Sequence, residues 1–270
     1  MRRASLLAIG LIPAILQAQN PASLGKPVRI IDSIPAPESV AVGPDGSWYV
    51  SSFGKFGNGS DGAVYRVDPD KRTRELFAGG LEDPCGVLFV GTTLWVADRK
   101  GVYRVSRGKV ELVYPEASLP RKLHFLNDLA RGPRGTMYVS DTGDSTAAGH
   151  GAVFVLAPGK RPVVLPGSDT VHAQSSANGL FPARGDTLFV VGYRTGLLSL
   201  TDGHGFWEGS PDGIDGAGRE SFYVSDDVGG ELFLPADLVV DRKRGWPVVP
   251  ENAGNRLSVY KLTKLNSRDT

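Results

Sequence analysis

Cysteine and histidine are scarce in this chain, and charge of either sign is not in excess. One Cys and four His occur among 270 residues, and 30 Lys and Arg are balanced by 29 Asp and Glu. A lone cysteine, Cys85, excludes an internal disulfide, and we expect a buried structural thiol there. The balanced charge offers no overall attraction for nucleic acid or an anionic membrane. We expect a monomer that acts on a small-molecule substrate and binds no nucleic acid.

Several catalytic motifs are also missing. The chain has no Gly-x-Ser-x-Gly elbow, no His-Glu-x-x-His pair and no Walker loop, which excludes the serine-hydrolase, zinc-protease and nucleotide-hydrolase classes that depend on them. The segment 57–62, Gly-Asn-Gly-Ser-Asp-Gly, matches a dinucleotide fingerprint in form only, because a strand follows it where a helix is needed. We interpret it as a hairpin loop.

The N-terminus differs in composition from the rest. Arg2 and Arg3 precede an apolar run from Ala4 to Leu16, and small residues follow around Ala18. This order is typical of a secretory signal peptide, predicted over residues 1–19. The run is too short for a transmembrane helix, and no later stretch approaches 18 apolar residues. We therefore expect residues 20–270 to form one exported domain, periplasmic or extracellular, with no membrane span.

Turn-forming residues are abundant, with 35 Gly and 19 Pro, and they separate short apolar strands in a repeating pattern. Six units can be aligned. They open around Glu38, Cys85, Asn127, Asn178, Asp212 and Asp237. In five units an apolar or aromatic strand position follows 11 residues later, as from Glu38 to Tyr49, and in the second unit it follows 10 residues later. A tighter hairpin explains the shorter unit.

A unit of about 42 residues matches a four-stranded blade, so we predict an all-β fold, a six-bladed β-propeller. Residues 27–34 form an isolated strand pattern, and we expect it to complete the last blade. The fifth unit is short, only 25 residues from Asp212 to Asp237, and we expect it to lack its outer strand. Asp98, Asp141 and Asp226 recur after second strands and are interpreted as structural hydrogen-bond acceptors. Trp48, Trp95, Tyr138 and Tyr223 are expected to pack between blades.

The six opening residues would lie around one end of the central channel. Oxygen donors from Glu, Asn and Asp that converge on an axis suit a hard cation such as Ca²⁺ or Mg²⁺, whereas Zn²⁺ is less natural without His. The alternative is that these polar side chains only cap backbone groups around a water-filled channel.

The residues themselves resemble a known family. Pro37-Glu38, Asn127-Asp128, Ala177-Asn178-Gly179-Leu180 and Pro211-Asp212-Gly213, with a final Asn255-Arg256-Leu257, are similar to the gluconolactonase, regucalcin and luciferin-regenerating enzyme family. The resemblance implies one divalent cation, Ca²⁺ first, with Mg²⁺, Mn²⁺ or Zn²⁺ as alternatives, held by Glu38, Asn178 and Asp212. It also implies that Asn127 contacts substrate or the water on the cation.

The implied reaction is hydrolysis of a lactone or related ester. The cation would polarise the carbonyl while Asp212 takes a proton from the attacking water, so Asp212 and Asn127 are the expected catalytic residues. Asp128 is expected near the substrate. Lys122, His124 and His172 are further candidates for substrate contact.

One departure bears on specificity. Sugar-lactonase members carry an Arg two residues before the Asn of the Asn-Asp pair, and this chain has Phe125 there. Two long loops, 53–61 and 142–150, are expected over the same face. The competing functional hypothesis is a non-catalytic propeller of the NHL kind that binds a protein, peptide or glycan on that face, since fold alone does not choose.

Overall fold

The computed structural model describes residues 26–143, 151–168, 177–182, 188–192, 196–199, 213–217, 220–224 and 236–261. Nearly all regular structure in these residues is β-strand. Two short 3-10 helices interrupt it, η1 (Glu116–Ser118) and η2 (Pro133–Gly135). In the described part of the chain, no helix has the length and apolar character needed to cross a membrane. The predicted signal peptide, residues 1–19, lies outside the described residues.

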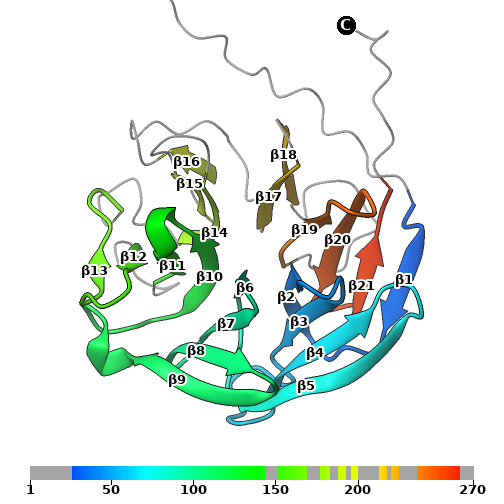
Figure 1. The fold of residues 1–270 in the computed structure, drawn as a ribbon, viewed down its shortest axis with the longest axis horizontal. Coiled ribbons are helices and arrows are strands. Elements are labelled where there is room, and N and C mark those ends of the chain that lie inside the picture. The colour runs from blue at the N-terminus through cyan, green and yellow to red at the C-terminus, as the bar shows by residue number, and fades with distance from the viewer. Residues whose placement is uncertain are drawn as a thin grey trace, which may run out of the picture.

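Three consecutive antiparallel sheets of four strands begin the fold (Figure 1). The first contains β2 (Pro37–Val42), β3 (Trp48–Ser52), β4 (Gly62–Asp68) and β5 (Thr73–Leu81). The second contains β6 (Val87–Val90), β7 (Thr93–Asp98), β8 (Gly101–Ser106) and β9 (Lys109–Pro115). The third contains β10 (Leu126–Arg131), β11 (Met137–Asp141), β12 (Ala152–Leu156) and β13 (Val163–Val164).

The remaining sheets continue the meander. A three-stranded sheet contains β14 (Ala177–Pro182), β15 (Leu188–Gly192) and β16 (Gly196–Ser199), and a two-stranded sheet contains β17 (Gly213–Ala217) and β18 (Glu220–Val224). Residues 225–235 lie outside the described residues, so the expected absence of an outer strand in this fifth unit stays a prediction. A last four-stranded sheet holds β19 (Val239–Asp241), β20 (Trp246–Glu251), β21 (Arg256–Val259) and β1 (Arg29–Asp32).

The first strands of the sheets lie around a common axis. β2, β6, β10, β14, β17 and β19 contact one another in chain order, and β19 contacts β2. Each sheet with described outer strands extends outward from this ring (Figure 1). The chain is therefore an all-β propeller, with four complete four-stranded blades among the described residues.

The last sheet is completed by the N-terminal strand, as the sequence predicts. β1 pairs antiparallel with β21, so that Ile31 lies opposite Leu257. The side chains of Ile31 and Ile34 are buried in a cluster with Trp48 of the first blade. Strands from the two ends of the described chain thus share one sheet, and apolar side chains buried between this sheet and the first blade join the last blade to the first.

The strand register explains the repeat spacing. Val40 lies opposite Val50, Leu129 opposite Val139 and Leu180 opposite Val190. In the second blade, Val87 lies opposite Val96, one residue less, because a two-residue turn joins Val90 to Thr93. Gly91 in that turn has a φ of 63°, a left-handed conformation that glycine adopts at little cost. The predicted tighter hairpin is confirmed.

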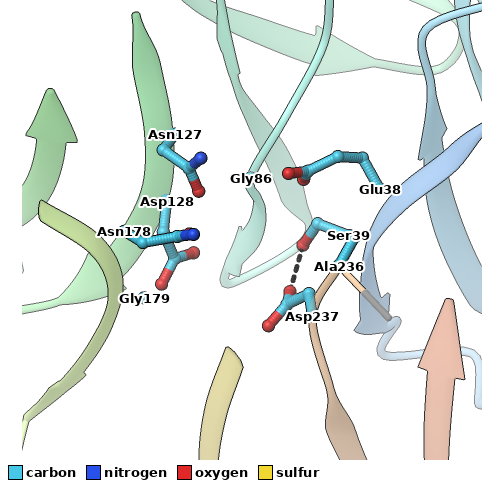
Figure 2. A pocket seen from close by; sticks show the side chains of 9 residues that line it. All are labelled: Glu38, Ser39, Gly86, Asn127, Asp128, Asn178, Gly179, Ala236 and Asp237. Atoms are coloured by element: carbon cyan, nitrogen blue, oxygen red, sulfur yellow. Dashed lines mark hydrogen bonds between the residues drawn. The ribbon is translucent and has the colours of Figure 1, made fainter. Parts of the chain in front are cut away.

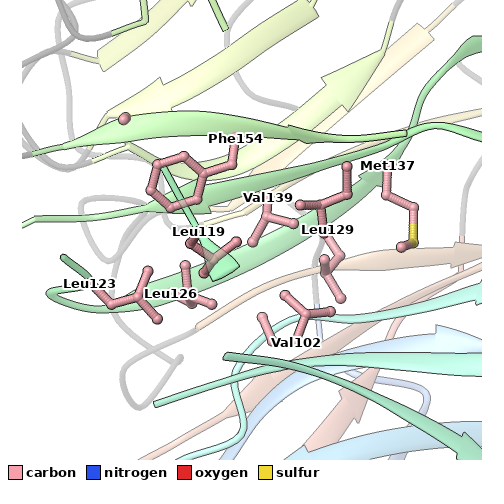
Figure 3. Packing of buried hydrophobic residues seen from close by; sticks show 11 residues of the cluster. Val102, Leu119, Leu123, Leu126, Leu129, Met137, Val139 and Phe154 are labelled. Carbon is pink, nitrogen blue, oxygen red and sulfur yellow. The ribbon is translucent and has the colours of Figure 1, made fainter. Parts of the chain in front are cut away.

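Packing between blades forms the core. One cluster joins Val102 of the second blade to Leu126, Leu129, Val139 and Phe154 of the third (Figure 3). Phe154 is fully buried there. Because the first blade is covered on both faces, its second strand β3 is buried at every residue from Trp48 to Ser52. Trp48, Trp95 and Tyr138 belong to or pack against such clusters, as predicted, whereas the side chain of Tyr223 lies outside the described residues.

The predicted structural role of the recurring aspartates is confirmed for two of them. Asp98 accepts hydrogen bonds from the backbone N–H of Glu82, at 2.9 Å, and of Lys100, at 3.3 Å. Asp141 accepts from the backbone N–H of Phe125, at 2.9 Å, and of Gly143, at 3.0 Å. Each carboxylate therefore pins the segment that leads into its blade. Asp226 lies outside the described residues.

Asp98 makes stability depend on pH. Burial raises the pKa of its carboxyl from 3.8 to about 6, so the folded protein holds a proton there that the unfolded chain releases. The resulting stabilisation is present below pH 4 and is lost as pH rises to about 6. Relative to Asp98→Asn, the wild-type free energy of unfolding should fall by about 2 kcal/mol between pH 4 and pH 7. Urea denaturation of both proteins across this range tests it, and parallel pH curves would contradict it.

Candidate functional site

The innermost strands of three blades share the same irregularity. The pairing register shifts between Pro37 and Val40, between Leu126 and Leu129, and between Ala177 and Leu180. Such a bulge bends the strand and turns side chains away from the regular pleat. The residues at the three bulges are Glu38-Ser39, Asn127-Asp128 and Asn178-Gly179, which include the predicted ligands of the first and fourth blades.

Serine hydroxyls hold two of these bulges in place. Ser51 Oγ, from β3, accepts the backbone N–H of Ser39 at 2.9 Å. Ser140 Oγ, from β11, accepts the backbone N–H of Asp128 at 2.8 Å and donates to the carbonyl of Asn178 in the next blade at 2.6 Å. A backbone N–H that loses its ladder partner is thereby satisfied, and the bulged residues are fixed relative to the next blade.

The bulged residues meet at a small, narrow pocket between the innermost strands (Figure 2). Its lining comprises Glu38, Ser39, Gly86, Asn127, Asp128, Asn178, Gly179, Ala236 and Asp237. The Glu38 carboxylate lies across the pocket from the amides of Asn127 and Asn178 (Figure 2). With Asp128, which also lines the pocket, the structure brings four of the predicted site residues together from three blades.

All the charged side chains that line the pocket are acidic. The lining includes three carboxylates, on Glu38, Asp128 and Asp237, and no basic side chain. Glu38 and Asn127 are each only 7% exposed. Acidic side chains gathered in a confined space create a negative potential that attracts cations.

The two asparagine amides have no partner within the described part of the chain. Neither the Asn127 nor the Asn178 side chain hydrogen-bonds to another described residue, although their backbone carbonyls accept bonds from Gly86 and Ser140. Unpaired amides in a confined polar site are costly unless water or a ligand meets them. Amide and carboxylate oxygens are ligand types that a hard cation accepts, and the described residues contain no cluster of three or more His, Cys, Asp or Glu side chains placed to hold a metal ion.

Glycine at position 86 allows the second and third blades to meet at the pocket. The Gly86 N–H donates to the Asn127 carbonyl at 2.5 Å. A Cβ at Gly86 would lie 2.6 Å from that oxygen and 2.7 Å from Asp128 Cα, so any side chain would push the blades apart. The preceding residue, Cys85, is fully buried, and burial raises the pKa of its thiol well above the usual range. The expectation of a buried thiol is confirmed.

Asp237 is the pocket residue that the predicted ligand set omits. Its Oδ2 accepts a hydrogen bond from the Ser39 hydroxyl at 2.5 Å (Figure 2). This bond joins the last blade to the first at the pocket wall. The sequence repeat indicates that Asp237 lines the pocket, because Asp237 opens the sixth unit at the same position that Glu38 occupies in the first.

Asp128 has contacts of its own. Its carboxylate accepts the backbone N–H of Leu129 at 2.6 Å and, across the blade boundary, that of Leu180 at 2.7 Å. Asp128 therefore ties the third blade to the fourth while it lines the pocket, and its predicted contact with substrate stays a prediction.

The other predicted site residues fall elsewhere. Lys122 and His124 are exposed in the segment before β10, and neither lines the pocket. Asp212 and His172 lie outside the described residues, as does 144–150 of the predicted second loop. Their roles stay predictions.

Comparison with known proteins relates the fold to others. No family model matches the chain, and no curated protein matches it. Among solved structures, a gluconolactonase from Xanthomonas campestris is similar over 90% of this chain and 82% of its own, with 19% identity and a TM-score of 0.53. The fold is gluconolactonase-like.

A second solved structure with a similar fold is an extracellular domain. The extracellular domain of a protein assigned as a one-component system of B. thetaiotaomicron matches over 83% of this chain, with 11% identity and a TM-score of 0.55. This chain spans about a third of that structure, 33% of its length. At such identities the two likenesses establish the fold alone, and function has to be argued from the pocket.

Proposed function

We propose that the protein is an exported, metal-dependent hydrolase of a lactone or related ester, built as a six-bladed propeller with its site on the channel axis. The observation that carries this proposal is the convergence of Glu38, Asn127 and Asn178 in one acidic pocket. The pattern of the first nineteen residues supports export.

The cation would be held by oxygen atoms of Glu38, Asn178 and Asp212. Ca²⁺ suits this set best, because it accepts mixed carboxylate and amide ligation and a flexible number of ligands. Mg²⁺, Mn²⁺ and Zn²⁺ are alternatives for the test below. Asp237, on the pocket wall beside Ser39, supplies a further carboxylate whose negative charge favours a divalent ion.

When bound, the cation would withdraw electron density from the substrate carbonyl. Asp212 accepts a proton from water, and the oxygen of that water adds to the carbonyl carbon. The ring C–O bond then breaks, and the proton on Asp212 passes to the departing alkoxide, which releases a hydroxy acid. The Asn127 amide, unpaired within the described residues, donates a hydrogen bond to the carbonyl oxygen.

The test is hydrolysis of a lactone and aryl-ester panel by the mature protein, first stripped of metal and then supplied with each of the four ions. We expect turnover to return with a divalent ion and to be abolished in Asp212→Ala. Asp70→Ala, which removes an exposed carboxylate on an outer turn, is the matched control and should retain full activity.

Two results would overturn the hydrolase. Cation binding without turnover of any panel member would favour the competing hypothesis, a propeller that binds a protein, peptide or glycan on this face. Turnover that is unchanged in the metal-free protein would contradict the role of the cation.

A further inference from the structure

Three phenylalanine side chains form a cluster at one end of the propeller. Phe56 packs edge to face on Phe53, with ring centroids 5.4 Å apart, and lies against Phe125 at 5.8 Å. Phe53 and Phe56 belong to the loop after β3 of the first blade, whereas Phe125 precedes β10 of the third. The loop therefore passes over the start of the second blade to reach the third.

This aromatic cluster, Phe53, Phe56 and Phe125, lies at the end of the strands where the pocket is found, outside the residues that line it. Phe125 stands two residues before Asn127, about 7 Å along an extended chain. Phe53 directly follows Ser52, which pairs with Pro37 beside Glu38, and its backbone N–H donates to the Ala36 carbonyl at 3.2 Å. Phe125 thus belongs to the segment that carries Asn127, and Phe53 is hydrogen-bonded through its backbone to the segment that carries Glu38.

Specific bonds hold the loop in this position. The backbone N–H of Gly57 donates to Asp83 Oδ1 at 2.8 Å, and Asp83, in the segment before Gly86, is buried. The Asp61 carboxylate accepts the backbone N–H of Lys55 at 3.1 Å and the Asn58 side chain at 3.3 Å. Phe56 is nevertheless 61% exposed, so the anchored loop presents an aromatic ring to solvent beside the polar pocket.

We propose that the aromatic cluster is the subsite for an apolar alkyl or aryl substituent of the substrate. This inference rests on the proposed hydrolase and narrows its substrate class to hydrophobic lactones or esters. Phenyl rings gain free energy by covering apolar surface, but they cannot hydrogen-bond to the hydroxyls of a sugar lactone, whose desolvation would then be uncompensated. The cluster therefore favours substrates with a hydrocarbon chain over polyhydroxylated ones.

The test measures binding separately from turnover. The probes are δ-lactams with alkyl chains from methyl to heptyl, which resist hydrolysis, titrated by calorimetry into the mature protein with Ca²⁺. Each added methylene should tighten binding roughly two- to fourfold, the larger value corresponding to full burial. In Phe56→Ser this dependence on chain length should be largely lost. Leu76→Ser, which removes an equally exposed apolar side chain from outer strand β5, should retain it.

The outcomes separate the two proposals. Chain-length-dependent lactam binding that Phe56→Ser removes supports the subsite, whether or not any lactone is hydrolysed. If such binding occurs without turnover of the matching alkyl lactones, the hydrolase fails while the apolar subsite stands. Equal binding of all chain lengths, a stronger response to a sugar lactam, or an unchanged slope in Phe56→Ser would overturn the subsite even in an active enzyme.

Discussion

Replacing Glu38 with Gln should weaken divalent-cation binding by about 10²- to 10³-fold. The amide keeps the size of the side chain but removes a negative charge that faces the pocket. Two opposite unit charges 4 Å apart at an effective dielectric of 20 attract each other by about 4 kcal/mol. The dipole of the Gln amide recovers part of this energy, and the remaining loss corresponds to an affinity about 10²- to 10³-fold lower. Calorimetric titration of Ca²⁺ into metal-free protein measures the change. An affinity within about threefold of wild type would contradict the cation site.

A thermal readout separates this effect from damage to the fold. Wild-type protein should melt at a higher temperature when the cation is added, because the ion binds the folded state. Metal-free Glu38→Gln should melt no lower than metal-free wild type, since it loses repulsion from Asp128 and Asp237, which line the same pocket, and it should gain little from the cation. Glu75→Gln, an exposed carboxylate on outer strand β5, should behave as wild type in both assays.

The second large effect concerns closure of the ring. Ile31→Ala in β1 should lower the free energy of unfolding by about 2–5 kcal/mol, because this side chain is 3% exposed in the cluster with Trp48 and Leu257 and its removal leaves a cavity. Ile30, the preceding residue, lies on the opposite face of β1 and is 38% exposed. Ile30→Ala should therefore lower the free energy of unfolding by less than about 0.5 kcal/mol. Urea denaturation of the two variants gives the comparison.

The combination Ile31→Ala with Ile34→Ala extends the test. Ile34 is fully buried in the same cluster, and a combined loss of roughly 4–8 kcal/mol is comparable to the whole stability of many domains. We expect the double variant to be largely unfolded at ambient temperature by circular dichroism. Equal costs for Ile30→Ala and Ile31→Ala would show that β1 does not close the ring through its buried face.

Much of this fold could be predicted from local pattern. The constant separation within units predicts the hairpins, and the shorter second unit predicts a tighter hairpin, which the structure provides as a two-residue turn at Gly91. The pattern of residues 27–34 predicts an isolated strand that completes the last blade. In the structure this strand is β1, which pairs with β21 of that blade. These predictions succeed because strand alternation, turn chemistry and repeat length act over a few neighbouring residues.

The candidate site could be predicted only in part. The position of Glu38, Asn127 and Asn178 at the starts of inner strands predicts that they share one end of the channel, and they line one pocket. Their inclusion in a cation site stays a prediction, as do the roles of Asp212 and His172. The sequence assigns Lys122 and His124 only to a loop before the third blade, and in the structure neither residue lines the pocket.

The sequence by itself determined the strands, their repeat and the polar residues that open each unit, because these depend on local chain chemistry. Only the tertiary structure decided which of them meet. Ser39 and Asp237 are 198 residues apart and share a hydrogen bond, and Phe56 reaches Phe125 across an intervening blade. The physical reason is that contacts between blades depend on the bulges, the close approach at Gly86 and the closure of the ring, which act through space and leave no period in the sequence.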